Sequence, residues 1–349
     1  MSSLKIKLSL IASAISIVAL LCLGIISFYF NKNALFSQVV SAEKSYVENG
    51  KDAIELFIEK NVKSLEKLNE SISSAQYNSQ KEFEDFLSMT FKDFKDGGGF
   101  MAVYIGFPNG DKLSSDIDSD KKKLRTVRSG PNIDNYDSRT RDWYNSALKT
   151  KEVYISPIYT DSATKELVFT FSKAFYKDGK LIGVIAVDEP LTELQDTYDR
   201  LPGRVFAFDK DNSIVVSSDH SFKGKDPNIL ILKEEYSKVK ENELFYYTRN
   251  DGIERFAICA PASDYTTCIA EDIKIINDPV LKIAYIQTVA VIIIIALSII
   301  LLYFIISHFI SPLVAIQKGL NSFFDFINHK TKNITTIDVK SNDEFGQIS

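Results

Sequence analysis

One run of residues constrains the architecture more than any other: residues 283–310 are IAYIQTVAVIIIIALSIILLYFIISHFI and contain no Asp, Glu, Lys or Arg. In its central part, residues 289–306, only Ser298 and Tyr303 carry polar side-chain atoms. A helix rises about 1.5 Å per residue, so this run is long enough to cross a hydrocarbon core of roughly 30 Å. A core helix of a globular domain is seldom apolar on every face over such a length. We therefore predict a transmembrane helix over residues 283–310.

A second uncharged run, residues 8–30, lies near the N-terminus. The alternative to a transmembrane helix here is a cleaved signal peptide, for which Lys5 and Lys7 would supply the positive start. However, the run is longer than the apolar part of a typical signal peptide. It also ends in three aromatic residues, 28–30, rather than in a small-x-small cleavage site. We therefore expect an uncleaved transmembrane helix.

The two spans define a two-pass topology. Lys5 and Lys7 place residues 1–7 in the cytoplasm by the positive-inside rule, although Lys32 makes the charge asymmetry modest. Residues 31–282 then lie on the outer side of the membrane, and the C-terminal part returns to the cytoplasm.

Composition argues against several classes of function. The chain has 349 residues and a formal net charge of -5, so it lacks the basic footprint of a nucleic-acid-binding protein. It has three His, and we find no Ser-His-Asp set, no Gly-x-x-x-x-Gly-Lys phosphate loop and no cluster with metal-ligand spacing. We expect no enzyme activity, no metal, no cofactor and no nucleic-acid partner.

Two of the three cysteines, Cys259 and Cys268, lie in the external segment on either side of a turn-like stretch, residues 260–264. A hairpin there could bring them within bridging distance, and an oxidising compartment would preserve a disulfide. The alternative is a pair of buried free thiols. Cys22 falls within the first span and is expected to be inert.

The spacing of apolar residues in the external segment predicts a long helix followed by two α+β units. Apolar residues recur at helical spacing over residues 35–73, and a second helix is expected over residues 81–94. A membrane-distal unit covers about residues 81–190 and a membrane-proximal unit about residues 204–272. Both contain a hairpin and further strands, which suggests a structural repeat without a sequence repeat. Strands are expected at residues 101–105, 153–158, 167–173, 181–187, 205–208, 213–216, 244–248, 254–260 and 266–270.

Three other segments carry local signals. A short helix is expected over residues 140–150, and Pro190 is expected to begin a connecting helix. The charge-rich residues 116–128 are expected to form a solvated loop. After the second span, Pro312 is expected to open a new helix near its first turn.

The C-terminal segment, residues 311–349, continues with apolar residues at helical spacing and then reaches Asp-Glu-Phe-Gly at residues 343–346. Acidic groups at that point are typical of the first turn of a helix. Together with Pro312, this pattern resembles an incomplete HAMP linker. We expect the chain to be either a fragment of a longer product or a truncated receptor.

The order of long helix, two α+β units and return helix resembles the double Cache sensor domains of bacterial chemoreceptors and sensor kinases. The resemblance implies an α+β fold with a long N-terminal helix and two tandem PAS-like subdomains built on antiparallel sheets. Two transmembrane helices would flank this domain, and a HAMP-like helical linker would follow it. The resemblance also implies a homodimer, or a heterodimer with full-length receptors, because the family's output depends on paired helices.

A sharper resemblance lies in the first unit, where residues 136–144 are YDSRTRDWY. With Tyr159 and Asp188 downstream, this stretch is similar to the amino-acid-binding motif of double Cache methyl-accepting chemotaxis receptors. The resemblance implies that the carboxylate end of a ligand is held by Arg141, Trp143 and Tyr144. It implies that the α-amino end is held by Tyr136, Tyr159 and Asp188.

The chemistry of these residues suits a zwitterion. Burying a free amino acid strips water from both charges, so each charge needs a charge-assisted partner. Arg141 supplies a planar fork suited to a carboxylate, and Asp188 supplies an anion at the end of a predicted strand. Asp161 could supply a second anion. The aromatic residues of the motif could form walls around the ligand and attract its ammonium by cation–π interaction.

Each residue also has a purely structural alternative. Arg141 could pair with Asp142 or Asp137 at the surface, and Arg139 could exchange roles with it. The aromatic residues could be core packing, and Asp188 could cap the helix expected at Pro190. The carboxylates of Asp161 and Asp188 could in principle do acid–base work, although pairing with a ligand ammonium explains them more simply.

We therefore predict a chemoreceptor sensor module that binds a small amino acid in the distal unit and transmits a helix shift across the membrane. Two alternatives stay open. One is a Cache input module of a sensor histidine kinase or nucleotide cyclase, which the output domain would decide. The other is a Cache receptor for an organic acid, which would not need Asp188, or for an amine, which would not need Arg141.

Overall fold

The computed structural model describes residues 2–118, 123–161 and 164–331, and it has the α+β class that the sequence predicts. The chain divides into two compact units. One combines residues 1–39 with residues 274–349, and the other comprises residues 40–273. The first unit holds two long apolar helical segments, and the second holds two antiparallel sheets with short helices.

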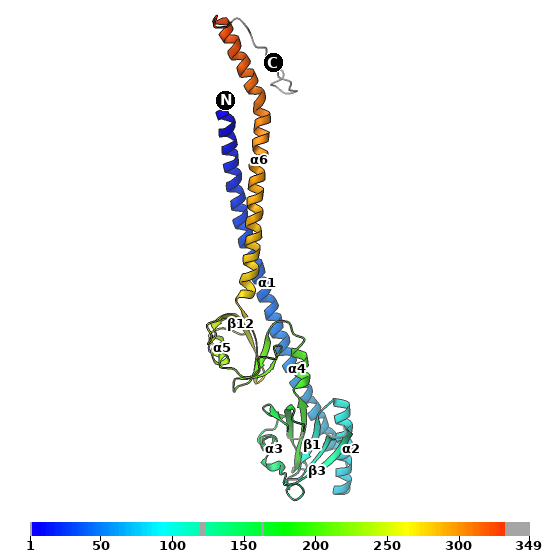
Figure 1. The fold of residues 1–349 in the computed structure, drawn as a ribbon. Helices are drawn as coiled ribbons and strands as arrows, with labels where there is room; N and C mark the ends of the chain where they lie inside the picture. Colours follow the sequence, from blue (N-terminus) through cyan, green and yellow to red (C-terminus); the bar gives the residue numbers. More distant parts are fainter. Residues whose placement is uncertain (1, 119–122, 162–163, 332–349) are drawn as a thin grey trace. The chain divides into compact units, whose positions relative to one another are not determined.

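The N-terminal helix α1 spans Ser2–Ser74 without interruption (Figure 1). The sequence predicted two helices, over residues 8–30 and 35–73, and their separation is wrong. Residues 31–34 are Asn-Lys-Asn-Ala and contain no Pro or Gly, so nothing there breaks the backbone hydrogen-bond ladder. One helix therefore provides both the first apolar span and the long helix that packs against the sheets.

The C-terminal helix α6 spans Lys274–Ile327 and includes both Pro279 and Pro312. The expectation that Pro312 begins a separate helix is therefore wrong. Apolar residues continue at helical spacing on both sides of Pro312, so the helix accepts the loss of one backbone donor there. The first part of the HAMP-like segment belongs to α6, and its residues 332–349 lie outside the described residues.

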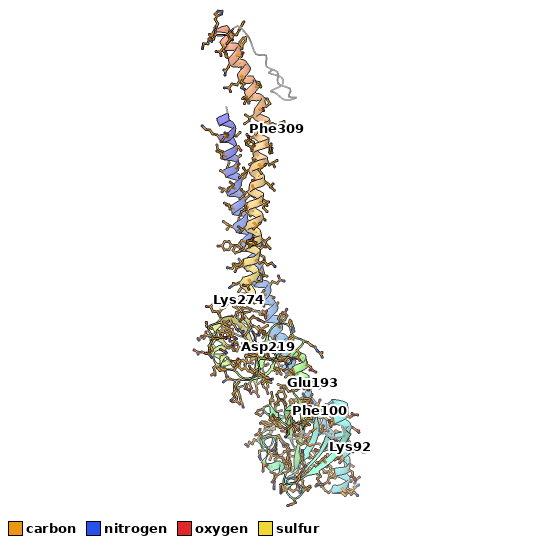
Figure 2. The ribbon with its side chains drawn as sticks, viewed as in Figure 1. Lys92, Phe100, Glu193, Asp219, Lys274 and Phe309 are labelled. Atoms are coloured by element: carbon orange, nitrogen blue, oxygen red, sulfur yellow. A yellow bond between two sulfur atoms is a disulfide. The ribbon has the colours of Figure 1, made fainter. Side chains whose placement is uncertain are left out.

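Two of the described helices are long and apolar enough to cross a membrane: Ile6–Ser74 and Lys274–Ile327. Their large apolar side chains are exposed over most of the candidate spans; Phe309, labelled in Figure 2, is one of them. The two helices meet at Gly24, whose carbonyl oxygen accepts a hydrogen bond from Gln287 Nε2 at 3.1 Å. This pattern suits helices whose apolar surface faces lipid rather than water.

The first sheet contains seven strands in the order β3-β2-β1-β7-β6-β4, with β5 paired to β6. The strands are β1 (Ala102–Gly106), β2 (Lys112–Asp118), β3 (Lys123–Ser129), β4 (Tyr154–Ile155), β5 (Tyr159–Thr160), β6 (Leu167–Lys177) and β7 (Lys180–Pro190). Asp178 and Gly179, both with positive φ, make the two-residue turn between β6 and β7.

One face of this sheet packs on helices and the other carries the short helical elements. The helix α2 (Gln80–Gly98) buries Phe83, Leu87 and Phe91 against the sheet together with residues of α1. The 3₁₀ helix η1 (Ser138–Thr140) and the helix α3 (Asp142–Ala147) lie near the opposite face. Figure 1 shows α2 and α3 on opposite sides of β1.

Two expectations for the part of the chain that forms the first sheet are wrong. Of the charge-rich residues expected to form a loop, 116–118 belong to β2 and 123–128 belong to β3, and these two strands pair; residues 119–122 lie outside the described residues. The antiparallel register runs from Lys112 opposite Ser129 to Asp118 opposite Lys123, and β2 also pairs with β1, so backbone pairing holds these residues in strands. The helix α4 begins at Thr192 rather than at Pro190, because Pro190 is the last residue of β7 and pairs with Val168.

The second sheet repeats the topology of the first, with the strand order β10-β9-β8-β13-β12-β11. Its strands are β8 (Val205–Phe208), β9 (Ser213–Ser217), β10 (Gly224–Lys225), β11 (Leu244–Thr248), β12 (Glu254–Ala262) and β13 (Tyr265–Asp272). In each sheet the strand that comes first along the chain pairs with the one that comes last: β1 with β7, and β8 with β13. This shared topology confirms the structural repeat. The helices α4 (Thr192–Tyr198) and α5 (Asn228–Tyr236) complete the unit, and the sequence did not predict α5.

The face of the second sheet that carries α5 is filled with hydrocarbon. Phe206, Phe208 and Phe245 pack there with Ile229 and Leu232 of α5. Cys259 and Cys268 are opposite each other on β12 and β13, are completely buried and form a disulfide. The buried cation on this face, Arg255, already has a partner, because its Nε donates a hydrogen bond to Asp272 at 2.7 Å.

Mass spectrometry of the unreduced protein should find no alkylatable thiol at Cys259 or Cys268. Replacing both with Ser should lower the free energy of unfolding by about 2–3 kcal/mol, because the bond closes a short loop in the unfolded chain. Recovery of both residues as alkylated thiols would contradict the bridge. Cys22→Ser serves as the matched control, since this cysteine lies in an apolar span and is free.

Candidate ligand-binding site

Polar side chains gather on the face of the first sheet that does not contact α1 and α2. Because side chains alternate along a strand, Tyr104 of β1, Thr170 and Ser172 of β6, and Asp188 of β7 lie on the same face. All four are buried. A buried sheet face with this much polar surface requires hydrogen bonds for every group, or a ligand that completes them.

Asp188 is the charged centre of this face. Its side-chain Oδ1 accepts hydrogen bonds from the Tyr104 hydroxyl at 2.8 Å and from Thr170 Oγ1 at 2.6 Å. The Tyr159 hydroxyl is in turn 2.7 Å from Thr170 Oγ1. Both hydrogen bonds that described residues donate to Asp188 end on Oδ1, so Oδ2 is the oxygen available to a ligand.

Burial dominates the electrostatics of Asp188, whose residue surface is 6% exposed. Desolvation raises the pKa of its carboxyl to about 7, although the hydrogen bonds from Thr170 and Tyr104 and the nearby charge of Lys112 oppose this rise. The negative charge of Asp161 acts in the same direction as burial. The carboxyl therefore needs an additional positive partner to remain fully ionised at neutral pH.

The short helix α3 covers this face of the sheet. Its buried Trp143 packs edge-on against Tyr104, with ring centroids 5.0 Å apart, and the Trp143 carbonyl accepts a hydrogen bond from Ser172 Oγ at 2.8 Å. Gly106 permits this approach, since a Cβ atom there would lie 2.7 Å from the Trp143 ring and 2.9 Å from Cβ of Ser138. The sheet thus fixes the position of α3 through a hydrogen bond, an aromatic contact and one glycine.

A cavity of about 360 Å³ opens beside α3. Its lining comprises Thr140, Arg141, Asp142, Trp143, Ser156, Pro157, Ile158 and Tyr159. Asp188 is not part of this lining. It lies beneath the cavity, and the Tyr159 hydroxyl connects the two through Thr170. A ligand in the cavity would therefore reach Asp188 past the hydroxyl of Tyr159.

Arg141 enters the site without a carboxylate partner among the described residues. Its guanidinium carbon lies 5.9 Å from the centre of the Tyr136 ring, and the residue is exposed to the cavity. The alternative pairings are taken by other residues: Arg139 Nη2 binds Asp137 Oδ2 at 2.6 Å, and the Asp142 carboxylate accepts hydrogen bonds from Ser146 and Tyr154. The arrangement leaves Arg141 as the cation directed at the cavity.

The charges of Arg141 and Asp188 act on the same aromatic residues. The pKa of the Tyr159 hydroxyl is raised by its burial and by Asp188, and Arg141 opposes the rise. The pKa of Tyr136 is likewise raised by burial, with Lys112 and Arg141 lowering it and Asp188 raising it. Tyr136 and Tyr159 therefore lie within the electrostatic reach of both charges, although Arg141 and Asp188 do not contact each other.

Two of the predicted site residues occupy secondary positions. Tyr144 is buried beside Trp143, with ring centroids 5.7 Å apart, and does not line the cavity. Asp161 uses its Oδ2 atom to accept hydrogen bonds from the backbone N–H and the hydroxyl of Thr164, which orders the turn after β5. Asp188 does not cap a helix, because it lies within β7.

Sequence reasoning missed three residues of this site: Tyr104, Thr170 and Lys112. Tyr104 and Thr170 hold Asp188, and the ammonium nitrogen of Lys112 lies 5.2 Å from the Tyr104 ring centre and 5.0 Å from that of Tyr136. Strand alternation would have placed Thr170 and Tyr104 on one face had the pairing been known. The sequence contains no signal for which strands pair, so this part of the site was not predictable.

A larger cavity, of about 610 Å³, lies elsewhere in the sensor domain, and its lining includes Leu191, Gln195, Val215 and Phe222. Of its charged residues, Glu166, His220 and Lys223 are exposed, and Asp209 accepts hydrogen bonds from the backbone of its own turn. This cavity therefore has no buried fixed charge with which to hold a charged ligand.

Comparison with known proteins agrees with this architecture. A family model for the first PDC sensor domain of methyl-accepting chemotaxis protein-like proteins matches residues 86–196. The chain is 25% identical over 229 residues to the methyl-accepting chemotaxis protein McpC of Bacillus subtilis, and this match covers 64% of the chain and 33% of McpC. The chain thus spans about a third of the length of that curated relative.

Solved structures of one chemoreceptor sensor domain are also similar. The sensory domain of Campylobacter jejuni Tlp3 with isoleucine bound is 30% identical, with a TM-score of 0.61 over 71% of this chain and 98% of that domain. The Tlp3 ligand-binding domain in complex with L-norvaline is 29% identical, with a TM-score of 0.63 over 71% and 96%.

The chain therefore belongs to the family of PDC/Cache sensor domains of methyl-accepting chemotaxis proteins. It carries a chemoreceptor sensor domain, built as a tandem of two Cache-like sheets, together with two candidate membrane-spanning helices. The homologues are receptors, and no catalytic family is indicated.

The carboxyl of Asp188 should titrate near pH 7 in the ligand-free protein. Trp143, the only Trp in the sequence, touches Tyr104, which binds Asp188, so its fluorescence should change with the ionisation. The measurement is a fluorescence titration of the full chain in lipid nanodiscs from about pH 5 to about pH 9.

Asp188→Asn should remove this transition. Asp161→Asn should move it to lower pH, because the Asp161 charge raises the pKa of Asp188. A transition of unchanged midpoint and size in Asp188→Asn would show that another group titrates.

Proposed function

We propose that this chemoreceptor domain senses a free amino acid, bound between α3 and the first sheet. The single observation that carries the proposal is a pair of incompletely compensated charges of opposite sign at one site: Arg141 in the cavity lining, and Asp188 connected to that lining through Thr170 and Tyr159. Arg141 lacks a carboxylate partner among the described residues, and Asp188 is buried with one carboxylate oxygen available. A zwitterion is the small ligand that satisfies both groups at once.

The carboxylate end of the ligand would bind Arg141. A guanidinium presents two parallel N–H donors, which match the two oxygens of an α-carboxylate. Trp143 lies next along the cavity wall, and the backbone at residues 140–142 limits how far the ligand can move. Removing this cation would leave a carboxylate without its partner in a partly desolvated cavity.

The α-amino end would bind Asp188 through Oδ2. An ammonium at that point supplies the positive charge that the buried carboxyl lacks, so binding would lower the pKa of Asp188 from its ligand-free value of about 7. The ring of Tyr159 would face the ammonium and attract it by cation–π interaction, whereas the ring of Tyr136 already lies beside Lys112 and Arg141. The hydroxyl of Tyr159, now held by Thr170, would move aside or accept a hydrogen bond from the ligand.

The similar solved domains support this class of ligand. The Tlp3 domain, about 30% identical to this chain, has been solved with isoleucine and with L-norvaline. The second sheet offers no comparable site, because its corresponding face is filled by Phe206, Phe208 and Phe245. The first sheet is therefore the part of this chain that would take the amino acid.

Signalling would follow from a shift between two states of the domain. A ligand shifts such an equilibrium only by its difference in affinity for the two states. Closure of α3 on the ligand would change the first sheet, which packs on α1, and a displacement of about 1–2 Å is usual for helices that transmit such signals. In this proposal the sensor domain lies in the periplasm, the chain crosses the inner membrane twice, and the receptor acts as a dimer.

Amino-acid binding should change Trp143 fluorescence in the full chain and raise its melting temperature. A screen of the twenty amino acids, organic acids and amines would identify the ligand through stabilisation by mass action. Arg141→Ala and Asp188→Asn should each weaken binding by at least about 30-fold, because each leaves one ligand charge without a partner.

Two neighbouring residues provide matched controls for these variants. Arg139→Ala removes a cation two positions from Arg141 that is already bound to Asp137, and Glu189→Gln changes the residue next to Asp188 on β7. Both controls should bind as the unmodified protein does. Unchanged affinity in Arg141→Ala and Asp188→Asn would place the site elsewhere, and selective binding of acids or amines would identify another ligand class.

Affinity for the ligand should also fall with decreasing pH. The ammonium requires an ionised Asp188, and the ligand-free carboxyl has a pKa of about 7, so protons compete with the ligand below that pH. The dissociation constant should rise about tenfold between pH 8 and pH 6, as measured by calorimetry. A dissociation constant independent of pH over this range would contradict a role for Asp188 in holding the ammonium.

A further inference from the structure

Lys112 brings a second cation to the face of the first sheet that carries Asp188. It is the first residue of β2 and pairs with Gly106 at the end of β1. Its ammonium nitrogen lies 5.0 Å from the centre of the Tyr136 ring and 5.2 Å from the centre of the Tyr104 ring. Lys112 is therefore directed toward the aromatic residues of the proposed site rather than toward bulk solvent.

Lys112 has no ion-pair partner within 4.0 Å among the described residues. The acidic groups that feel its charge are Asp188 and Asp134. The Asp134 carboxylate already accepts hydrogen bonds from the backbone N–H groups of Gly130 and Tyr136. The ammonium thus lies close to the site with its hydrogen-bonding capacity unused by carboxylates.

The charges of the site exceed the needs of a simple zwitterion. An α-carboxylate takes one cation and an α-ammonium takes one anion, and Arg141 and Asp188 provide these. Asp161 is occupied by its own turn at Thr164. Asp142 lines the cavity, and its carboxylate accepts hydrogen bonds from Ser146 and Tyr154. Among the described residues Lys112 is the remaining cation, and it flanks the Tyr136 ring together with Arg141.

We propose that Lys112 recognises the side chain of the ligand, and that this receptor prefers amino acids whose side chain ends in a carboxylate. This inference rests on the proposed function and names its ligand class. Two cations and one buried anion would match the two carboxylates and one ammonium of such a ligand. Amino acids with a side-chain carboxylate differ from isoleucine and L-norvaline, the ligands of the Tlp3 complexes. Binding data can therefore distinguish this inference from the expectation that the chain binds the same ligands as Tlp3.

The test compares the binding of L-glutamate, L-glutamine and L-norvaline, which have the same five-carbon skeleton. Binding is measured by calorimetry on the full chain in lipid nanodiscs. The ratio of glutamate to norvaline affinity is the readout. Loss of the Lys112 charge also raises the pKa of Asp188, but that effect weakens all α-amino acids equally and cancels in the ratio. Glutamate should bind more tightly than norvaline, with glutamine between them.

Lys112→Met keeps an unbranched side chain, one heavy atom shorter, and removes the charge. It should lower the glutamate-to-norvaline ratio by about 10- to 100-fold, the range expected for a hydrogen bond to a charged group. Lys112→Arg should recover most of this ratio. Lys173→Met is the matched control, since Lys173 lies on β6 and binds Glu66 of α1 on the opposite side of the sheet.

The outcomes distinguish the failure of this inference from the failure of the proposed function. An equal loss for all three ligands in Lys112→Met would mean that Lys112 holds the α-carboxylate, and an unchanged ratio would mean that it does not contact the side chain. Either result overturns the inference and leaves the amino-acid sensor intact. Failure of every amino acid to bind the unmodified chain would instead remove the proposed function itself.

Discussion

A buried carboxylate sets the character of this sensor domain. Asp188 lies on a sheet face where desolvation strongly disfavours its charge, and the hydroxyls of Tyr104 and Thr170 stabilise that charge only in part. The fold tolerates this cost in a strand that packs well on its other face. A buried group whose charge is incompletely compensated is a natural place for a ligand of opposite charge, since binding removes the imbalance.

The two sheets show how one topology serves two purposes. Their strand orders correspond, and each places α1 against one face. On the other face the second sheet carries Phe206, Phe208 and a disulfide, so packing stabilises it without a ligand. The first sheet carries the buried polar residues Asp188 and Thr170 at that face, and in the proposed function a ligand compensates the cost of burying them.

Local patterns in the sequence predicted most of the elements but not their ends or pairings. Hydropathy located both apolar spans, yet it placed a break at residues 31–34 and another at Pro312, and the structure has continuous helices at both. The many charged residues in 116–128 led to the prediction of a loop where the structure has parts of β2 and β3. These two strands are stabilised by pairing with each other, and β2 also pairs with β1. A strand pair depends on residues far apart in the chain, so local composition misjudges it.

The sequence by itself determined the α+β class, the two apolar helices, the tandem units and the motif from Tyr136 to Asp188, because these follow from periodicity and residue type along the chain. Only the tertiary structure decided which residues meet. Within the described part of the chain it left Arg141 without a carboxylate partner, because Asp137 pairs with Arg139, and it placed Tyr144 outside the cavity lining. It also brought Tyr104, Thr170 and Lys112 to the proposed site. These relations arise from strand register and from the seating of α3 on the sheet, which are properties of long-range packing.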